Sequence, residues 1–180
     1  MGSLAIFAVL VIALILSGCG GGGSDGATTE PRPKSVPPHF HQAHYDVRIY
    51  NGWPQYESDK KVGSYLESAW HDGGNSDVDI MIASRPAENA GSAMANAELA
   101  RIQAEQLPGY KARVLKKVKV GKQPAVSFGF ALPKKAFFGY FFERCGTSII
   151  VRDWMPPSEY STYTTSAREM ASSIRIVCPS

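Results

Sequence analysis

Three histidines lie close together in one segment, and imidazole is a common protein ligand for zinc and copper. His39, His41 and His44 are spaced two and three residues apart, so three neutral rings could share one ion. A structural site normally needs a fourth fixed ligand, and a segment without stable structure loses conformational entropy when it supplies ligands. We therefore predict solvated histidines and no metal site, with these three as the only weak candidates.

A second set of polar residues flanks a predicted hairpin. His71 and Asp79 would approach each other across two antiparallel strands, with Asp72 and Asp77 nearby, and would resemble part of an acid–base pair. No matching nucleophile follows, because the sequence has no Gly-x-Ser-x-Gly, no His-Glu-x-x-His and no Gly-rich phosphate loop. We predict an exposed hairpin with ordinary turn acids, no catalytic residue, no cofactor and no enzymatic activity.

Residues 106–142 carry positive charge only. The interval has no acidic residue and contains Lys111, Arg113, Lys116, Lys117, Lys119, Lys122, Lys134 and Lys135. On a strand over 110–120, alternation would place four basic residues on one face, namely Lys111, Arg113, Lys117 and Lys119. The other face would carry Ala112, Val114, Val118 and Val120, with Leu115 and Lys116 breaking the pattern.

Such a basic stripe would attract an acidic partner or an anionic lipid surface, where each lysine contributes up to about 1 kcal/mol. An edge strand that its lysines protect from aggregation is the alternative. The whole chain has a formal net charge of only +3, a value that does not predict nucleic acid as a partner.

The beginning of the chain predicts its location. Residues 4–16 are apolar without a break and would span about 20 Å as a helix, which suits a signal peptide better than a membrane-spanning anchor. Leu16-Ser17-Gly18-Cys19 then resembles the lipobox of bacterial lipoproteins. The resemblance implies cleavage before Cys19, diacylglycerol on its thiol, and attachment to the extracytoplasmic face of the cell membrane. Met1-Gly2-Ser3 departs from the pattern because it lacks Lys and Arg, so plain secretion or an uncleaved anchor are the alternatives.

The chain has three cysteines, and lipid on Cys19 would leave Cys145 and Cys178. An oxidising compartment would pair them. The closed loop of about 34 residues would then stabilise the fold by roughly 4 kcal/mol in the chain-entropy estimate. Two buried free thiols or a redox pair are the alternatives, although no Cys-x-x-Cys spacing supports a redox pair.

Three regions follow from the composition. We predict a signal peptide over 1–18, a flexible tether over 19–42 and one folded domain over 43–180. The tether is rich in Gly, Ser, Thr, Pro and His, and only Val36 and Phe40 are sizeable apolar residues, so it cannot repay the entropy of ordering. About 160 residues remain after cleavage, which suits a single domain.

Within the domain, hydrophobic patterns predict three strands, a helix, four strands and a helix. The strands are expected over 45–50, 65–71, 77–84, 110–120, 125–132, 136–145 and 147–154. The first helix, over 89–107, has Met94, Leu99 and Ile102 as its larger apolar residues, and the second begins with Ser158 as its N-cap. In the second helix Tyr160, Tyr163, Ala167, Met170 and Ala171 recur at helical spacing, and Ile174, Ile176 and Val177 return to the core.

The short turns between the later strands predict an antiparallel meander. The fold class is therefore α+β, an antiparallel sheet of about six to seven strands with helices packed on it. The strand with Phe137, Phe138, Tyr140, Phe141 and Phe142 is apolar on both faces, which indicates a central strand covered on both sides. A ligand pocket lined by these rings is the alternative.

Several of these features together resemble the PsbP-like fold. They are the first strand with Gly52-Trp53 after it, the stretch Val118-Lys119-Val120-Gly121-Lys122-Gln123-Pro124-Ala125 before an apolar strand, and the closing Ser172-Ser173-Ile174. The resemblance covers about 43–177. It implies an α/β/α sandwich, and many bacterial members are lipoproteins with no known enzymatic activity. No site residue is carried over, because that family has no shared catalytic motif.

We therefore expect a membrane-tethered extracytoplasmic lipoprotein that acts as a non-catalytic accessory or interaction domain. Its partners would be the membrane, through lipid on Cys19, and an acidic envelope component or anionic lipid surface. The alternative is a protein that binds a small or lipidic ligand in a pocket between sheet and helix. A hydrolase comes third. An accessory domain predicts a filled core and a flat basic surface, whereas a lipid-binding protein predicts an enclosed apolar cavity.

Overall fold

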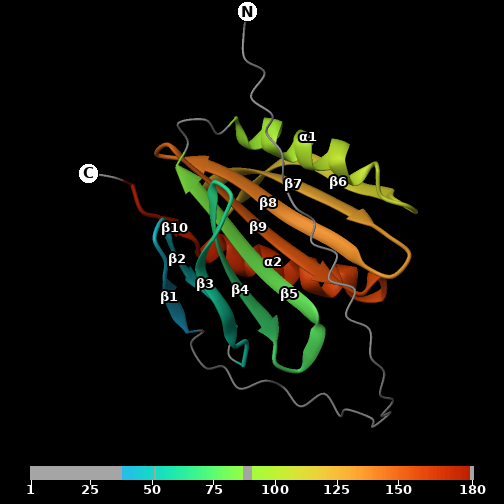
Figure 1. Ribbon diagram of the computed structural model, residues 1–180, viewed down its shortest axis with the longest axis horizontal. Helices are drawn as coiled ribbons and strands as arrows, with labels where there is room; N and C mark the ends of the chain where they lie inside the picture. Colours follow the sequence, from blue (N-terminus) through green and yellow to red (C-terminus); the bar gives the residue numbers. More distant parts are fainter. Residues whose placement is uncertain (1–37, 51, 87–90, 179–180) are drawn as a thin grey trace, which may run out of the picture. The chain divides into compact units, whose positions relative to one another are not determined.

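The computed structural model describes residues 38–50, 52–86 and 91–178 (Figure 1). Within these residues the predicted α+β class is confirmed: a seven-stranded and a three-stranded antiparallel sheet pack with two helices. In spatial order the large sheet consists of β3 (Gln55–Val62), β4 (Tyr65–Asp72), β5 (Asn75–Pro86), β9 (Thr147–Met155), β8 (Ala136–Arg144), β7 (Gln123–Ala131) and β6 (Lys111–Val120). The small sheet consists of β1 (His39–His41), β2 (Tyr45–Arg48) and β10 (Arg175–Ile176).

Tight turns build the predicted meander from β6 to β9. β8 and β9 are joined by Cys145 and Gly146, whose φ angles are +52° and +67°. Two positive φ values are what a two-residue type I′ turn requires, and the twist of such a turn matches that of the strands. Gly121, with φ of +59°, begins the turn between β6 and β7. These local turns order four neighbouring strands by themselves.

Two helices cover opposite faces of the large sheet (Figure 1). α1 (Ala93–Ala104) lies on β7 and β8, while α2 (Tyr160–Ser173) lies across β8 and β9 on the other face and also contacts β2. β8 is covered on both sides, as its sequence predicts: Phe138, Tyr140 and Phe142 pack in the α2-side core, whereas Phe137 and Phe141 pack in the α1-side core.

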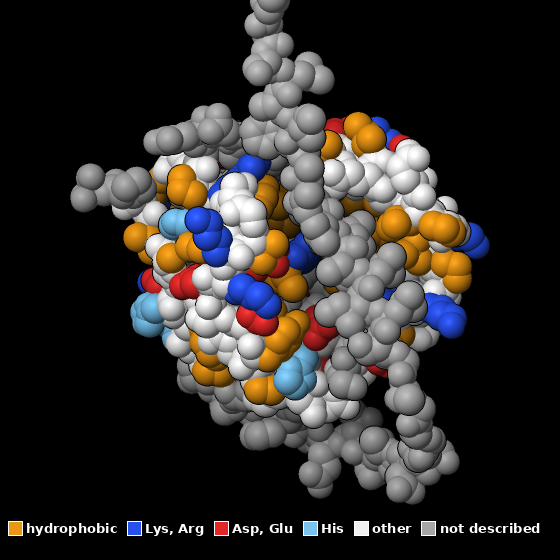
Figure 2. Space-filling view, in the orientation of Figure 1, with side chains coloured by type: hydrophobic (Ala, Val, Ile, Leu, Met, Phe, Trp, Pro, Cys, Tyr) orange, Lys and Arg blue, Asp and Glu red, His pale blue; other side chains and the backbone are white. Residues whose placement is uncertain are grey.

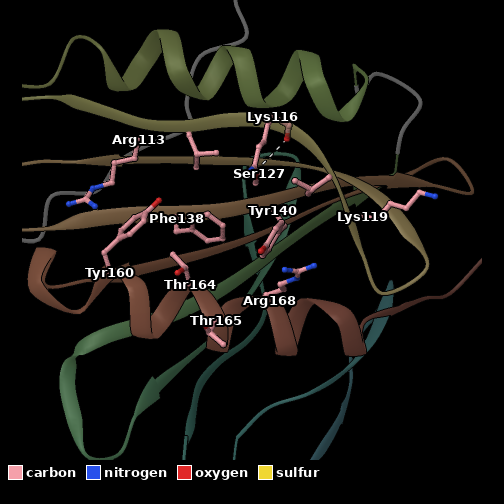
Figure 3. Close-up of a pocket in the computed structure, with 12 residues that line it drawn as sticks. Arg113, Lys116, Lys119, Ser127, Phe138, Tyr140, Tyr160, Thr164, Thr165 and Arg168 are labelled. Atoms are coloured by element: carbon pink, nitrogen blue, oxygen red, sulfur yellow. Dashed lines mark hydrogen bonds between the residues drawn. The ribbon is translucent and has the colours of Figure 1, made fainter.

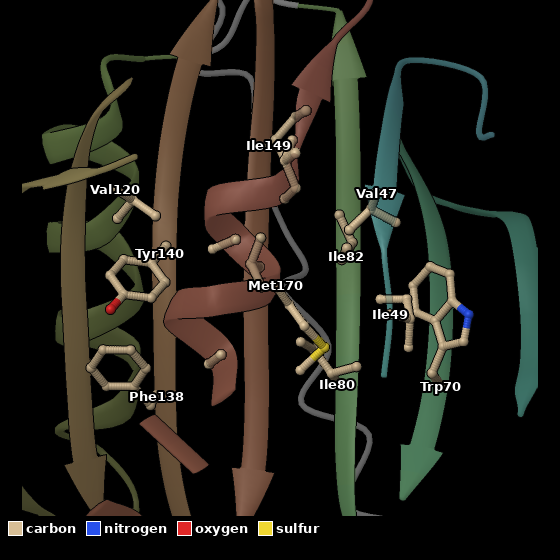
Figure 4. Close-up of a cluster of buried hydrophobic side chains, with 14 of the residues drawn as sticks. Val47, Ile49, Trp70, Ile80, Ile82, Val120, Phe138, Tyr140, Ile149 and Met170 are labelled. Atoms are coloured by element: carbon tan, nitrogen blue, oxygen red, sulfur yellow. The ribbon is translucent and has the colours of Figure 1, made fainter. Parts of the chain in front are cut away.

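The α2-side core is the larger of the two. Figure 4 shows Met170 of α2 among side chains of the large sheet, with Val47 and Ile49 approaching from β2 and the residue after it. The small sheet therefore completes the layer in which α2 lies. Trp70, Ile80, Ile82 and Ile149 are each 0% exposed in this core, and burial of such side chains stabilises a fold by about 1.5–3 kcal/mol each.

The face of α1 that packs on the sheet carries alanines rather than the larger Leu99 and Ile102. Leu99 and Ile102 are about half exposed, whereas Ala97 and Ala104 are buried. The sheet beneath α1 already carries large rings, among them Phe128 and Phe137. Small side chains allow the helix backbone to approach those rings closely, so the alanine side packs inward.

Four other features also differ from the expectations. The stretch after Pro54, where no strand is among those expected, forms β3. β1, which lies in the segment expected to be the tether, pairs with β2, and Phe40 packs on Trp70 with ring centroids 5.3 Å apart. Ser158 is not the N-cap of α2: it lies in a short 3-10 turn, η2 (Pro157–Glu159), and α2 begins after Glu159. Val177 is about half exposed rather than in the core.

Candidate functional site

A groove of about 870 Å³ lies between α2 and the face of the sheet formed by β6, β7 and β8. It is lined by Arg113, Val114, Lys116, Val118, Lys119, Ser127, Phe138, Tyr140, Tyr160, Thr164, Thr165 and Arg168. In Figure 3, Arg113 lies at one end beside Tyr160, and Lys119 lies at the other end, with Arg168 beside Tyr140. The groove exists because α2 crosses the sheet over β8 and β9 and leaves the strands at the β6 edge less covered.

The position of Tyr160 depends on a glycine in the facing strand. A Cβ atom at Gly129 of β7 would overlap the Tyr160 hydroxyl oxygen, so only glycine leaves room for this ring. The ring contacts Phe138 edge-on at 5.9 Å between centroids. Its hydroxyl is buried and has no hydrogen-bond partner among the described residues. The ring of Tyr160 thus forms a wall of the groove, and its hydroxyl is buried against Gly129.

A register shift in β6 places Arg113 over that ring. The pairing of β6 with β7 shifts between Ala112 and Val114, and a bulge of this kind redirects side chains. The Arg113 guanidinium carbon lies 4.3 Å from the centroid of Tyr160, a cation–π distance. The simple alternation predicted for β6 therefore fails at Arg113, which reaches the same side as Val114.

The charge of the groove is entirely positive. Arg113, Lys116, Lys119 and Arg168 are exposed, and none of the four forms a salt bridge within the described part of the chain. The lining contains no aspartate, glutamate or histidine. Four unpaired cations around one concave surface attract anions, and arginine can bind a carboxylate or a phosphate through two parallel hydrogen bonds.

Hydroxyl groups complete the lining. Burial raises the pKa of Tyr160 to about 12, although the nearby Arg113 opposes the shift, and burial also raises the pKa of Tyr140, which Arg168 opposes. Both phenols therefore keep their protons at neutral pH and can donate hydrogen bonds. The Ser127 hydroxyl donates to the Lys116 carbonyl oxygen at 3.4 Å. The groove offers cations and neutral donors without a general base, a set suited to binding an anion.

Of the four residues predicted to form a basic surface, the structure brings Arg113 and Lys119 into the groove. Lys111 and Lys117 are exposed on the same strand but do not line it. Lys116, which interrupted the expected pattern, is part of the lining. Sequence reasoning missed Arg168, Tyr160 and the two threonines as site residues, because nothing in the sequence indicates that α2 crosses beside β6.

The three candidate histidines do not converge. The His41 Nδ1 lies 2.7 Å from the Asp46 carboxylate, and the His44 Nδ1 lies 3.0 Å from the Ser84 hydroxyl oxygen. The His39 ring contacts the His41 ring at 4.6 Å. No group of three or more potential metal ligands occurs among the residues described by the structure.

His71 and Asp79 do lie opposite each other, in register between β4 and β5. The His71 ring packs against Tyr56 at 5.6 Å between centroids. Partial burial raises the pKa of Asp79, with Lys135 and His71 opposing the shift. Asp72, the last residue of β4, accepts a hydrogen bond from the Tyr163 hydroxyl at 2.9 Å. This hydrogen bond helps to hold α2 on the sheet.

Cys145 and Cys178 are joined by a disulfide bond, with a Cα–Cα distance of 5.3 Å. The bond ties the turn between β8 and β9 to the segment after β10. Cys19 and the rest of the expected signal peptide and lipobox lie outside the described residues. Within the part described, no helix has the length and apolar character needed to cross a membrane.

Solved structures with this arrangement of sheet and helices are known. The solution structure of cyanobacterial PsbP (CyanoP) from Synechocystis sp. PCC 6803 superimposes with a TM-score of 0.61 at 12% identity, over 90% of this chain and 99% of that chain. The fold is PsbP-like. The Ran-binding protein Mog1p from Saccharomyces cerevisiae gives a TM-score of 0.50 at 10% identity, over 79% of this chain and 97% of that chain.

A protein of unknown function from Pseudomonas aeruginosa, described as a putative regulator, also gives a TM-score of 0.50, at 13% identity, over 81% of this chain and all of that chain. No protein-family model and no curated protein matches the sequence. At these identities the similarity concerns the fold alone, so the PsbP-like domain acquires no site residue from its structural neighbours.

Proposed function

We propose that this chain is a membrane-tethered, extracytoplasmic accessory protein that binds an anionic partner through the groove between α2 and β6–β8. One observation carries the binding part of the proposal: four exposed cations and no acidic residue line the groove. The whole chain has a net charge of only +3, so the concentration of one sign at a concave surface is local. Such a surface steers oppositely charged partners and disfavours others.

The tethering part rests on the sequence. Leu16-Ser17-Gly18-Cys19 after an apolar stretch supports lipid attachment at Cys19, and the disulfide fits an oxidising compartment outside the cytoplasm. The accessory role is supported by the shared fold, since Mog1p is a Ran-binding protein and uses a similar architecture. Together these features describe a domain held near a membrane that binds another envelope component.

A pocket for a lipidic ligand fits the groove less well. Such a pocket would be enclosed and apolar, whereas five of the lining residues are exposed, Arg113, Lys116, Lys119, Thr165 and Arg168. A small polyanion remains the second candidate, because four exposed cations line one concave surface and arginine can bind a phosphate or a carboxylate through two parallel hydrogen bonds. Native mass spectrometry of protein isolated from its own cells distinguishes a small polyanion from a polypeptide partner. A retained small anion supports the small polyanion, and a retained polypeptide supports the accessory role.

Two substitutions test the binding role directly. Lys119→Glu together with Arg168→Glu should abolish capture of the native partner, because each reverses a cation at the same end of the groove. Lys122→Glu with Lys134→Glu changes the net charge equally at exposed residues outside the groove and should leave capture nearly unchanged. Equal loss in both double variants would show that only net charge matters and would refute the groove as the site.

The membrane tether has its own test. In cells, Cys19→Ala should abolish metabolic labelling with a fatty acid and move the protein from the membrane fraction to the soluble fraction. If the variant stays in the membrane fraction and keeps its label, the tethering part of the proposal is wrong. The groove variants are measured separately, so one part can fail while the other stands.

A further inference from the structure

Within the described part of the chain, β6 is an edge strand of the large sheet. It is ten residues long and pairs there only with β7, so the backbone N–H and C=O groups on its outer side have no strand partner among the described residues. From Val114 to Val120 the register with β7 is continuous, and these residues extend over about 20 Å. We propose that β6 accepts an extended acidic segment of a partner polypeptide as an eighth strand of the sheet.

The opposite edge of the sheet is unsuited to this role. β3 has two register shifts in its pairing with β4, and Asp59 within it has a positive φ of 45°. The Asp59 carboxylate accepts a hydrogen bond from the Ala43 backbone N–H at 3.1 Å. Its charges are mixed, with Glu57 and Lys60 forming a salt bridge, and Figure 2 shows basic and acidic side chains intermingled over this part of the molecule. Bulges and mixed charge hinder pairing with another strand.

The charges along β6 are all positive. Lysines on an edge strand hinder its pairing with another copy of the same strand, and β6 carries five cations and no acid: Lys111, Arg113, Lys116, Lys117 and Lys119. Lys117 and Lys119 are about 7 Å apart along the strand, and like charges at that spacing repel each other. An acidic strand beside β6 would relieve this repulsion, whereas β6 of a second copy would increase it.

The backbone and the side chains select the same kind of partner. Only another extended polypeptide presents hydrogen-bonding groups at the spacing of a strand edge, which favours a peptide over a polyphosphate or a lipid headgroup. Alternate side chains of an added strand point to opposite faces of the sheet. Acidic side chains on the α2 side would reach the groove cations Arg113 and Lys116, and those on the α1 side would reach Lys117.

This inference rests on the proposed function only in that the partner is anionic. The test distinguishes failure of the added strand at β6 from failure of the anion-binding groove. The full-length protein in nonionic detergent is titrated with a fluorescent decapeptide in which pairs of Glu alternate with pairs of Thr, so that an added strand carries acidic side chains on both faces. Two further peptides serve as controls: one carries Gln in place of Glu, and the other keeps Glu but is N-methylated on alternate backbone amides, which blocks strand pairing. Peptide affinity and amide hydrogen exchange are measured.

We expect the Glu peptide to bind and to slow exchange in β6 but not in β3. N-methylation, Gln for Glu, and Lys117→Glu should each weaken binding by at least about tenfold, whereas Lys134→Glu should not. If the N-methylated peptide binds equally well, or if β6 exchange is unchanged, the added strand is refuted, although the anionic groove stands as long as Arg168→Glu still weakens binding. If neither acidic peptide binds, the strand inference is refuted, and the groove is judged by capture of its native partner.

Discussion

Asp153 allows the packing of the α2-side core to be tested by titration. Its side chain is 0% exposed, and neither carboxyl oxygen has a hydrogen-bond partner among the described residues. In the register of the sheet it lies between Ile80 of β5 and Phe138 of β8. Burial raises the pKa of this carboxyl well above its usual value, and the charges of Asp79 and Asp72 raise it further. Above about pH 4 and below this raised pKa, the folded protein therefore holds a proton that the unfolded chain releases.

The substitution Asp153→Asn keeps the shape and removes the titration. In the unfolded chain the carboxyl loses its proton near pH 4. Between that pH and the raised pKa of the folded state, the folded protein binds more protons, so its stability falls as pH rises. The free energy of unfolding of the variant, relative to that of the natural protein, should therefore rise by about 1.4 kcal/mol for each pH unit in this window. The gain should level off at the folded-state pKa of Asp153.

Urea unfolding at intervals between pH 4 and pH 8, under nonreducing conditions, measures the difference in free energy of unfolding. Asp77→Asn is the matched control, because Asp77 is an exposed carboxylate in β5, and its effect should change little with pH. A difference between Asp153→Asn and the natural protein that does not vary with pH would show that Asp153 is solvated or paired. A difference that shrinks as pH rises would contradict the sign of the argument.

Three further predictions concern the stability of the fold. Gly129→Ala should destabilise the fold by about 1–3 kcal/mol, measured by urea unfolding, because the added methyl overlaps the Tyr160 hydroxyl. Adding Tyr160→Phe, which removes that oxygen, should restore part of the loss, and a double variant no better than Gly129→Ala would argue against this contact. On α1, Ala97→Leu should cost about 1–3 kcal/mol because Ala97 is buried, and Leu99→Glu should cost under about 1 kcal/mol because Leu99 is half exposed. Thermal unfolding that ranked these two in the opposite order would mean that the other face of α1 packs on the sheet. Cys178→Ser should lower the free energy of unfolding by about 2–4 kcal/mol, and a variant as stable as the natural protein would show that the disulfide contributes nothing.

Much of the large sheet could be predicted from local patterns. The short turn at Gly146, the alternation in β5 and the double-sided apolar pattern of β8 each depend on residues close in the sequence. These features specify tight turns and a buried central strand whatever lies elsewhere in the chain, so the meander and the covered strand were both predicted. β3 was missed because its polar sequence and its register shifts hide the period of two.

The face of α1 and the location of the groove could not be predicted in this way. Hydrophobicity alone favours Leu99 over Ala97 as the buried residue, yet the large rings of the sheet leave room only for the small one. Gly129 is likewise uninformative until Tyr160 is seen to lie over it. Both outcomes depend on the shape of a partner surface far away in the sequence, which no local period encodes.

The sequence by itself therefore determined the α+β class, the order of most strands and the run of cations without acids around β6. It also supplies the lipobox-like segment at Cys19 on which the proposed tether depends. Only the tertiary structure decided what those cations face. A bulge turns Arg113 onto Tyr160, and α2 brings Arg168 to the same groove as Lys119. The physical reason is that strand alternation specifies only the face of a side chain, whereas a binding surface requires a second element whose position long-range packing sets.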